Sequence, residues 1–175
     1  MKRNPADQKP NYKSEDIKIS KSDNWRTPHD LFDKINREFH FDVDRAADKD
    51  NALCDLFYSK EESCVVSDFG NWSFRGFINP PYSDPGPFFY KAHEQRQNAL
   101  TVMLVKVATS EKYWFETVKN AHVRFFAGRI KFWDEENTPH YGATFPSALV
   151  IFSPEIETYE SSCWDYRKDI PERLF

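Results

Sequence analysis

Apolar residues recur at helical spacing directly after Thr27 and Pro28. They fall on one helical face, at Leu31, Phe32, Ile35 and Phe39. Thr27 is a good N-cap, and Pro28 suits the first helical position, where its missing N–H would be unpaired anyway. The pattern therefore predicts a helix over residues 28–38 that turns its apolar face to the core.

Short apolar runs predict the strands. The runs at 100–105 and 146–152 are the clearest, because both are continuous and of strand length. Further strands are expected at 39–44, 64–69, 75–78, 123–127 and 129–133, and helices at 88–97 and 111–120. Residues 51–58 are expected to form a short helix or turn.

The chain has 175 residues, which is enough for one domain with its own core. Aromatic residues make up 17% of it, including 16 Phe, so we expect an aromatic-rich core. Residues 1–22 are rich in Lys, Asp, Ser and Pro and are predicted to be a flexible tail. The domain is expected over 23–153, and the pattern assigns no structure to the C-terminal extension, 154–175.

Cysteine and histidine spacing predicts no metal site. Cys54, Cys64 and Cys163 lack C-x-x-C spacing, and the five histidines are scattered. This usage indicates reduced thiols in a cytosolic protein. The charged N-terminal residues carry no apolar run, which argues against a signal peptide, and no run approaches the roughly 18 residues of a membrane span.

The formal net charge of −4 excludes a protein coated in positive charge. A local basic stripe is still enough to bind nucleic acid. Arg124, Arg129 and Lys131 alternate with aromatic residues around Gly128, in a predicted hairpin. This patch is the candidate nucleic-acid contact, and the alternative is an amphipathic hairpin whose charges simply face water.

The segment Asn79-Pro80-Pro81-Tyr82-Ser83 follows a predicted strand and carries the clearest candidate chemistry. The prolines end strand pairing and stiffen the corner. The Asn79 Oδ1 and the Pro80 carbonyl can accept both N–H bonds of an amino group conjugated to a ring, and Tyr82 offers a face for stacking. Such a site suits methylation of that nitrogen. The alternative is a proline-stiffened turn with a buried tyrosine.

The motif resembles the Asn/Asp-Pro-Pro-Tyr signature of amino methyltransferases that use S-adenosylmethionine. The resemblance implies a cofactor site of scattered residues, which are Trp25, Thr27, Pro28, Asp44, Ala46, Ala47, Asp68 and Phe69. In such a cofactor site, Asp44 pairs with the cofactor's ammonium group, and Thr27-Pro28 lies near the cofactor's carboxylate. Asp68-Phe69 contacts the adenine, unless Asp68 only starts a turn. The family's glycine-rich loop is absent here.

Taken in order, the motifs of residues 25–152 resemble the phage-type DNA N6-adenine methyltransferase (Dam-like) family. They are Trp25-x-Thr27-Pro28, Asp44-x-Ala46-Ala47, Asn51-Ala52, Asn79 to Ser83, Gly128-Arg129-Ile130 and Phe145-Pro146-Ser147. The resemblance implies a small α/β, Rossmann-like fold with a mostly parallel sheet flanked by helices. It also implies S-adenosylmethionine as methyl donor and a flipped adenine of double-stranded DNA as acceptor, with Ser83 and the basic patch contacting DNA. Such a protein would work in the cytoplasm of a bacterial host.

Three other outcomes stay open on the sequence. The same motif serves cytosine N4, adenine in RNA or a glutamine amide as acceptor. Without the glycine-rich loop, the chain can also be an inactive relative that only binds DNA or another protein. A structural protein with an incidental turn of this sequence is the third.

Overall fold

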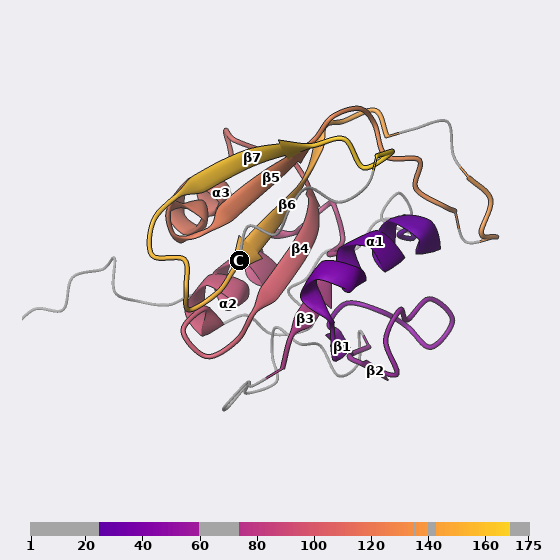
Figure 1. Ribbon diagram of the computed structural model, residues 1–175, viewed down its shortest axis with the longest axis horizontal. Helices are drawn as coiled ribbons and strands as arrows, with labels where there is room; N and C mark the ends of the chain where they lie inside the picture. The colour runs from indigo at the N-terminus through magenta and orange to yellow at the C-terminus, as the bar shows by residue number, and fades with distance from the viewer. Residues whose placement is uncertain (1–24, 60–73, 135, 140–142, 169–175) are drawn as a thin grey trace, which may run out of the picture.

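The computed structural model describes residues 25–59, 74–134, 136–139 and 143–168, which are arranged around one seven-stranded sheet (Figure 1). The strands are β1 (Val43–Asp44), β2 (Leu56–Phe57), β3 (Gly76–Ile78), β4 (Thr101–Lys106), β5 (His122–Phe126), β6 (Ser147–Phe152) and β7 (Glu160–Trp164). Their order across the sheet is β2-β1-β3-β4-β6-β5-β7. The tail predicted at 1–22 and the strand predicted at 64–69 lie outside the described residues.

The sheet is mostly parallel. The pairs β1–β2, β1–β3, β3–β4 and β5–β7 are parallel, whereas β6 runs antiparallel to both of its neighbours, β4 and β5. The carboxyl ends of β1, β3 and β4 therefore meet at one edge, which is where open α/β sheets bind their ligands.

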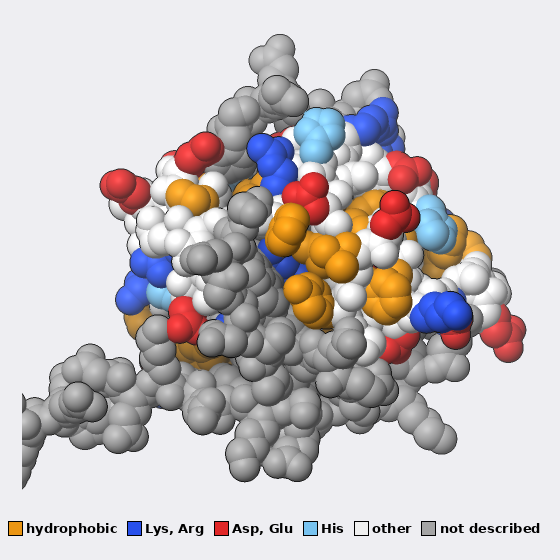
Figure 2. Space-filling model, turned by 90° about the horizontal axis from the view of Figure 1, so that it is seen from below, with side chains coloured by type: hydrophobic (Ala, Val, Ile, Leu, Met, Phe, Trp, Pro, Cys, Tyr) orange, Lys and Arg blue, Asp and Glu red, His pale blue; other side chains and the backbone are white. Residues whose placement is uncertain are grey.

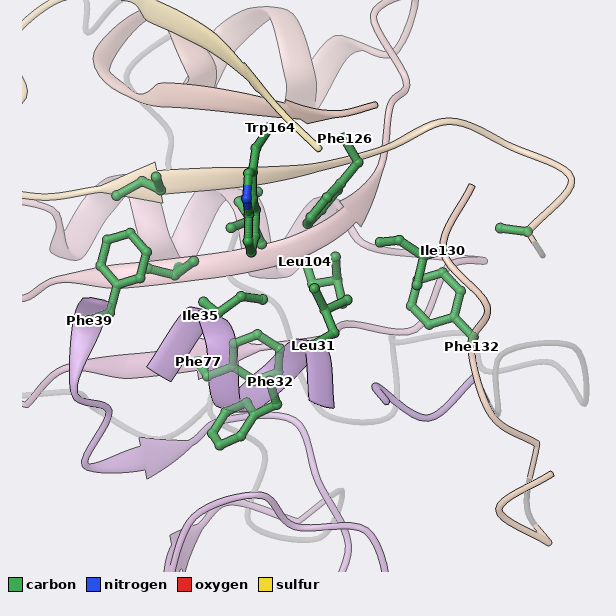
Figure 3. Close-up of a cluster of buried hydrophobic side chains, with 14 of the residues drawn as sticks. Leu31, Phe32, Ile35, Phe39, Phe77, Leu104, Phe126, Ile130, Phe132 and Trp164 are labelled. Atoms are coloured by element: carbon green, nitrogen blue, oxygen red, sulfur yellow. The ribbon is translucent and has the colours of Figure 1, made fainter. Parts of the chain in front are cut away.

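Helices cover both faces of this sheet (Figure 1). They are α1 (His29–Phe39), α2 (Gly86–Gln95) and α3 (Lys112–Thr117), which runs into the 3₁₀ turn η4 (Val118–Asn120). Successive residues of β4 face opposite sides. Met103 packs with α2 and α3, and Leu104 packs with α1. Figure 3 shows the buried hydrophobic cluster on the α1 side of the sheet, with Leu31, Phe32 and Ile35 of α1 beside Leu104. The predicted Rossmann-like α/β class is confirmed.

The helix predicted at 28–38 forms one residue later. Pro28 is its N-cap residue, and Thr27 makes no capping hydrogen bond, so the predicted capping role of Thr27 is wrong. The helix ends where His40 takes a left-handed conformation with φ of 52°. That turn shortens the strand predicted at 39–44 to Val43–Asp44.

Three other segments differ from the prediction. Part of 51–58 forms the edge strand β2, parallel to β1, because Tyr58 N–H bonds to the Asp44 carbonyl oxygen at 2.9 Å. Residues 129–133 do not pair as a hairpin with β5, since β6 and β7 already flank that strand. The segment 154–175 contains β7, which lies in the same sheet.

No helix among the described residues has the length and apolar character needed to cross a membrane.

Candidate active site

The Asn79 side chain is held by one hydrogen bond and keeps one acceptor to spare. It follows β3 directly, at the carboxyl edge of the sheet. Its Nδ2 donates to the Trp25 carbonyl oxygen over 2.8 Å. Its Oδ1 is buried and has no hydrogen-bond partner within the described parts of the chain. Leaving a buried acceptor unpaired costs about 1–3 kcal/mol, so this oxygen is well suited to receive an N–H from a ligand.

Two prolines fix the chain beside this amide. Pro80 is buried and Pro81 is half-buried. Neither has an N–H, and each ring restricts its own φ, so the ladder of β3 cannot continue. The stiff corner predicted at the end of a strand thus forms at the end of β3.

Tyr82 belongs to an aromatic cluster with Phe132 and Phe145. Its ring centroid lies 5.7 Å from that of Phe132 and 5.1 Å from that of Phe145, both in edge-on contacts. The hydroxyl is buried without a partner among the described residues. Burial raises the pKa of the Tyr82 phenol well above its usual value, so the ring stays neutral. The residue as a whole is only half-buried.

Asp44 is a buried carboxylate at the neighbouring strand end. It pairs with Phe77 in the parallel register of β1 and β3, two residues before Asn79. Its oxygens accept from the N–H groups of Ala46 and Leu53, at 3.3 Å and 3.2 Å. Burial outweighs these two bonds and raises the pKa of Asp44 to about 6, and no cation of the described residues offsets it. A buried carboxyl perturbed in this way is typical of a functional site.

Small residues form the turn that follows Asp44. Ala46 is half-buried and Ala47 is buried. The N–H of Ala47 donates to the Tyr58 carbonyl oxygen over 3.2 Å, which ties the turn to the end of β2. The predicted small-residue turn is therefore present at the strand end, without a glycine.

Thr27 supplies another buried polar atom without a partner. Its side chain is buried, and Oγ1 has no hydrogen-bond partner within the described ranges. Pro28 follows it, and the Pro28 carbonyl accepts the Phe32 N–H at 2.9 Å to open α1. The Thr27 hydroxyl, which does not cap the helix, thus lies beside the N-terminus of α1, whose free N–H groups favour an anion. Asp68 and Phe69, the predicted adenine contacts, lie outside the described residues.

Arg124 does not lie on the surface, so its predicted contact with nucleic acid is wrong. It is buried, and its guanidinium binds Glu38 with two hydrogen bonds of 2.6 Å and 2.8 Å. The pair links β5 to α1. Arg129, Lys131 and Ser83 are exposed, as a DNA contact requires.

The face of the molecule seen in Figure 2 carries Lys and Arg side chains interspersed with Asp and Glu. Hydrophobic side chains gather near its centre. The described residues on this face therefore form no continuous basic surface, in keeping with the net charge of −4.

Sequence reasoning missed three groups at this edge. Lys106 ends β4, is exposed, and places Nζ 5.9 Å from the Phe145 ring centroid. Its position as the first charge after a buried strand could have identified it. Phe132 was assigned to a strand, and nothing in the sequence indicated that it would pack on Tyr82. The Trp25 carbonyl, like any main-chain group, carries no signal in the sequence.

Among the described residues, no His, Cys, Asp and Glu side chains are grouped to hold a metal ion.

Comparison with known proteins places the chain in a family. Over 146 residues it is 33% identical to the DNA N-6-adenine-methyltransferase of Haemophilus phage HP1, covering 79% of this chain and 83% of that protein. Over 112 residues it is 31% identical to the protein of the same name from Escherichia phage T1, covering 63% of this chain but only 47% of the relative. The chain thus spans about half of the T1 protein.

A third relative is the putative methyltransferase YfdM of Escherichia coli K12, which is 40% identical over 68 residues, or 34% of this chain and 71% of YfdM. The family described as DNA N-6-adenine-methyltransferase (Dam) matches residues 14–172, which include every candidate site residue. The chain belongs to the DNA N-6-adenine-methyltransferase (Dam) family.

Proposed function

We propose that this protein transfers a methyl group from S-adenosylmethionine to N6 of adenine in double-stranded DNA. The observation that carries the proposal is the buried Oδ1 of Asn79, which has no partner among the described residues and lies on a proline-stiffened corner at the carboxyl edge of the sheet. Family membership supports adenine as the group that receives the methyl. The Asn79 Oδ1 is an atom that can bind the amino group of that adenine.

Adenine N6 is out of reach inside a duplex, so the target base has to leave the stack, at a cost of a few kcal/mol. The half-buried Tyr82 ring receives the base, and stacking on an aromatic side chain recovers about 1–3 kcal/mol. The exposed residues Ser83, Arg129 and Lys131 contact the DNA backbone, and Lys106 adds a cation at the end of β4.

At the reacting nitrogen, the Asn79 Oδ1 and the Pro80 carbonyl each accept one N–H. Two acceptors on one amino group favour a pyramidal nitrogen, whose lone pair is then free to attack. When bound, S-adenosylmethionine supplies an electrophilic methyl group on a sulfonium. The amino nitrogen held by these two acceptors would take that methyl group as the bond from carbon to sulfur breaks, and it would then release one proton to water. Catalysis rests on positioning, which can supply several kcal/mol.

The residues present fit the methyl donor. Asp44 is a buried carboxylate without a compensating cation among the described residues, and it would hold the ammonium group. The Thr27 hydroxyl and the α1 N-terminus beyond Pro28 would hold the carboxylate, with Trp25 next to them. Ala46 and Ala47 leave the turn open, and Asp68-Phe69 is proposed for the adenine.

Binding of S-adenosylmethionine should weaken at acid pH. The pKa of Asp44 is raised to about 6 in the free protein, and a bound ammonium group lowers it. Protons therefore compete with binding below about pH 6 and not above it, so Kd should rise about tenfold per pH unit on the acid side. Titration calorimetry between about pH 5 and 7 measures this.

The control is Asp44→Asn. It should bind about 10- to 100-fold more weakly at pH 7, the equivalent of one charged hydrogen bond, and its affinity should not change over the same pH range. A wild-type Kd that stays constant below pH 6 would remove Asp44 from the cofactor site.

The whole proposal is tested by incubating the protein and methyl-labelled S-adenosylmethionine with duplex DNA, RNA or protein in separate reactions, then digesting the DNA to nucleosides. Label in N6-methyl-2′-deoxyadenosine is expected. Label in N4-methyl-2′-deoxycytidine, in RNA or in protein instead would mean that the methyl group goes to that molecule and not to adenine in DNA. No label in any of them, together with no cofactor binding, would favour a relative that only binds DNA.

A further inference from the structure

A short stretch of chain, Trp25–Pro28, crosses the end of β3 and is fixed from both sides. Arg26 and Trp133 form a two-bond bridge, with N–H to O distances of 2.8 Å and 3.0 Å. The Arg26 guanidinium also reaches Asn137 Oδ1 at 3.0 Å. Pro28 is bound into the first turn of α1. The Trp25 carbonyl shares a planar peptide unit with the Arg26 N–H, which is bound to the Trp133 oxygen, and it therefore has little freedom to turn.

This carbonyl decides which way the Asn79 amide points. A carbonyl oxygen can only accept a hydrogen bond, so the NH₂ end of the amide has to face it. The 2.8 Å contact from Nδ2 to the Trp25 oxygen meets that requirement. Oδ1 is thereby turned to the other side, where it is buried and unpartnered among the described residues. A main-chain N–H in place of this carbonyl would have held the amide in the opposite orientation.

We propose that the Trp25 carbonyl, held in place by Trp133, is a positioning group that aims Asn79 Oδ1 at the amino group of the target. The contact favours an amide at this position, since an ionised carboxylate would place an oxygen 2.8 Å from the Trp25 oxygen. The inference rests on the proposed function only for the identity of the ligand. The orientation of the amide rests on the contacts alone.

The discriminating variant is Asn79→Asp, which keeps the shape and both heavy-atom positions. When protonated, its carboxyl group can donate to the Trp25 carbonyl and still present an acceptor, as the amide does. When ionised, it loses that donor and is repelled by the carbonyl. Burial and the carbonyl dipole both disfavour the ionised form, so the pKa of the new carboxyl should lie above its usual value.

Methyl transfer by Asn79→Asp, relative to wild type at saturating DNA and S-adenosylmethionine, should therefore fall about tenfold for each pH unit above that pKa. The comparison covers about pH 5.5 to 8.5. Asn79→Ala is the control, because its ratio to wild type should not depend on pH. A flat ratio for Asn79→Asp, activity equal to wild type at pH 8, or no recovery at any acid pH would each overturn the proposal.

Thermal unfolding tests the same contact without any activity. The stability that the protonated carboxyl contributes is fully present below its unfolded pKa, about 4, and is lost as pH rises through its folded pKa. The Tm of Asn79→Asp relative to wild type should fall over that window, and that of Asn79→Ala should not. If wild type methylates no DNA yet this shift appears, the proposed function fails and the orienting role of Trp25 stands. A constant Tm difference overturns the orienting role whether or not DNA is methylated.

Discussion

Asn79→Ala is expected to slow methyl transfer by at least about 10²–10³-fold at saturating DNA and methyl donor, the usual cost of removing one preorganised polar partner. Of the two acceptors proposed for the target amino group, the substitution removes the one that belongs to a side chain. It also removes the 2.8 Å hydrogen bond from Nδ2 to the Trp25 carbonyl. The loss should appear in kcat, because the acceptor acts on the reacting nitrogen.

The matched control is Asn98→Ala, the same change at an exposed position after α2. It should leave the rate unchanged. Cofactor binding by Asn79→Ala should stay close to wild type, because Asn79 is not among the residues proposed to hold the cofactor. Its free energy of unfolding should fall by only about 0.5–1.5 kcal/mol, the usual loss for one hydrogen bond, here the bond from Nδ2 to the Trp25 carbonyl. A variant that methylates DNA at the normal rate would contradict the mechanism, and a variant that fails to bind the cofactor would move Asn79 to the cofactor site.

Sequence reasoning worked best where a single local signal determined the structure. The apolar face of Leu31 and Ile35 predicted α1 to within one residue, and the apolar runs of β4 and β6 predicted both strands. It failed where a residue's neighbours decide. Strand β2 was expected to be a helix or turn, and its pairing depends on a contact between Tyr58 and Asp44 that no local pattern shows.

The candidate site follows the same rule. The place of Asn79 at a strand end could be predicted, because prolines end strands by their own covalent structure. The partner of its amide could not, since Trp25 lies 54 residues away in sequence and contributes a main-chain atom. The hydroxyl of Thr27, which has no partner in the described part of the chain, likewise contradicts the strongest local expectation, which was an N-cap.

Arg124 shows the limit of reading charges along a strand. Its place among aromatic residues resembled a basic surface, but Glu38 and Phe39 at the end of α1 lie against its guanidinium. The guanidinium lies 5.7 Å from the Phe39 ring centroid and 5.9 Å from that of Trp164. Its partner, Glu38, is 86 residues away in sequence. An alternating pattern of charged and apolar residues does not show which face of a strand another element will bury.

Glu38→Gln is expected to lower the free energy of unfolding by about 3–5 kcal/mol, because it leaves the Arg124 charge buried without its counter-charge. The side chains of the pair are only 5% and 2% exposed. Denaturant unfolding measures the loss. Lys112→Gln is the control, since its pair with Glu116 spans 3.7 Å and the lysine is 82% exposed, which predicts a change of about 0–1 kcal/mol.

The double variant Glu38→Gln with Arg124→Met separates the contact from the charge. Removing both members leaves no unpaired buried cation, so the double variant should be less destabilised than the sum of the two single variants. Strict additivity would mean that the two charges do not interact, contrary to the two short hydrogen bonds between them. Glu38 lies in the last turn of α1, and Thr27 lies just before the start of that helix, so a loss of the pair should also weaken cofactor binding before the chain unfolds.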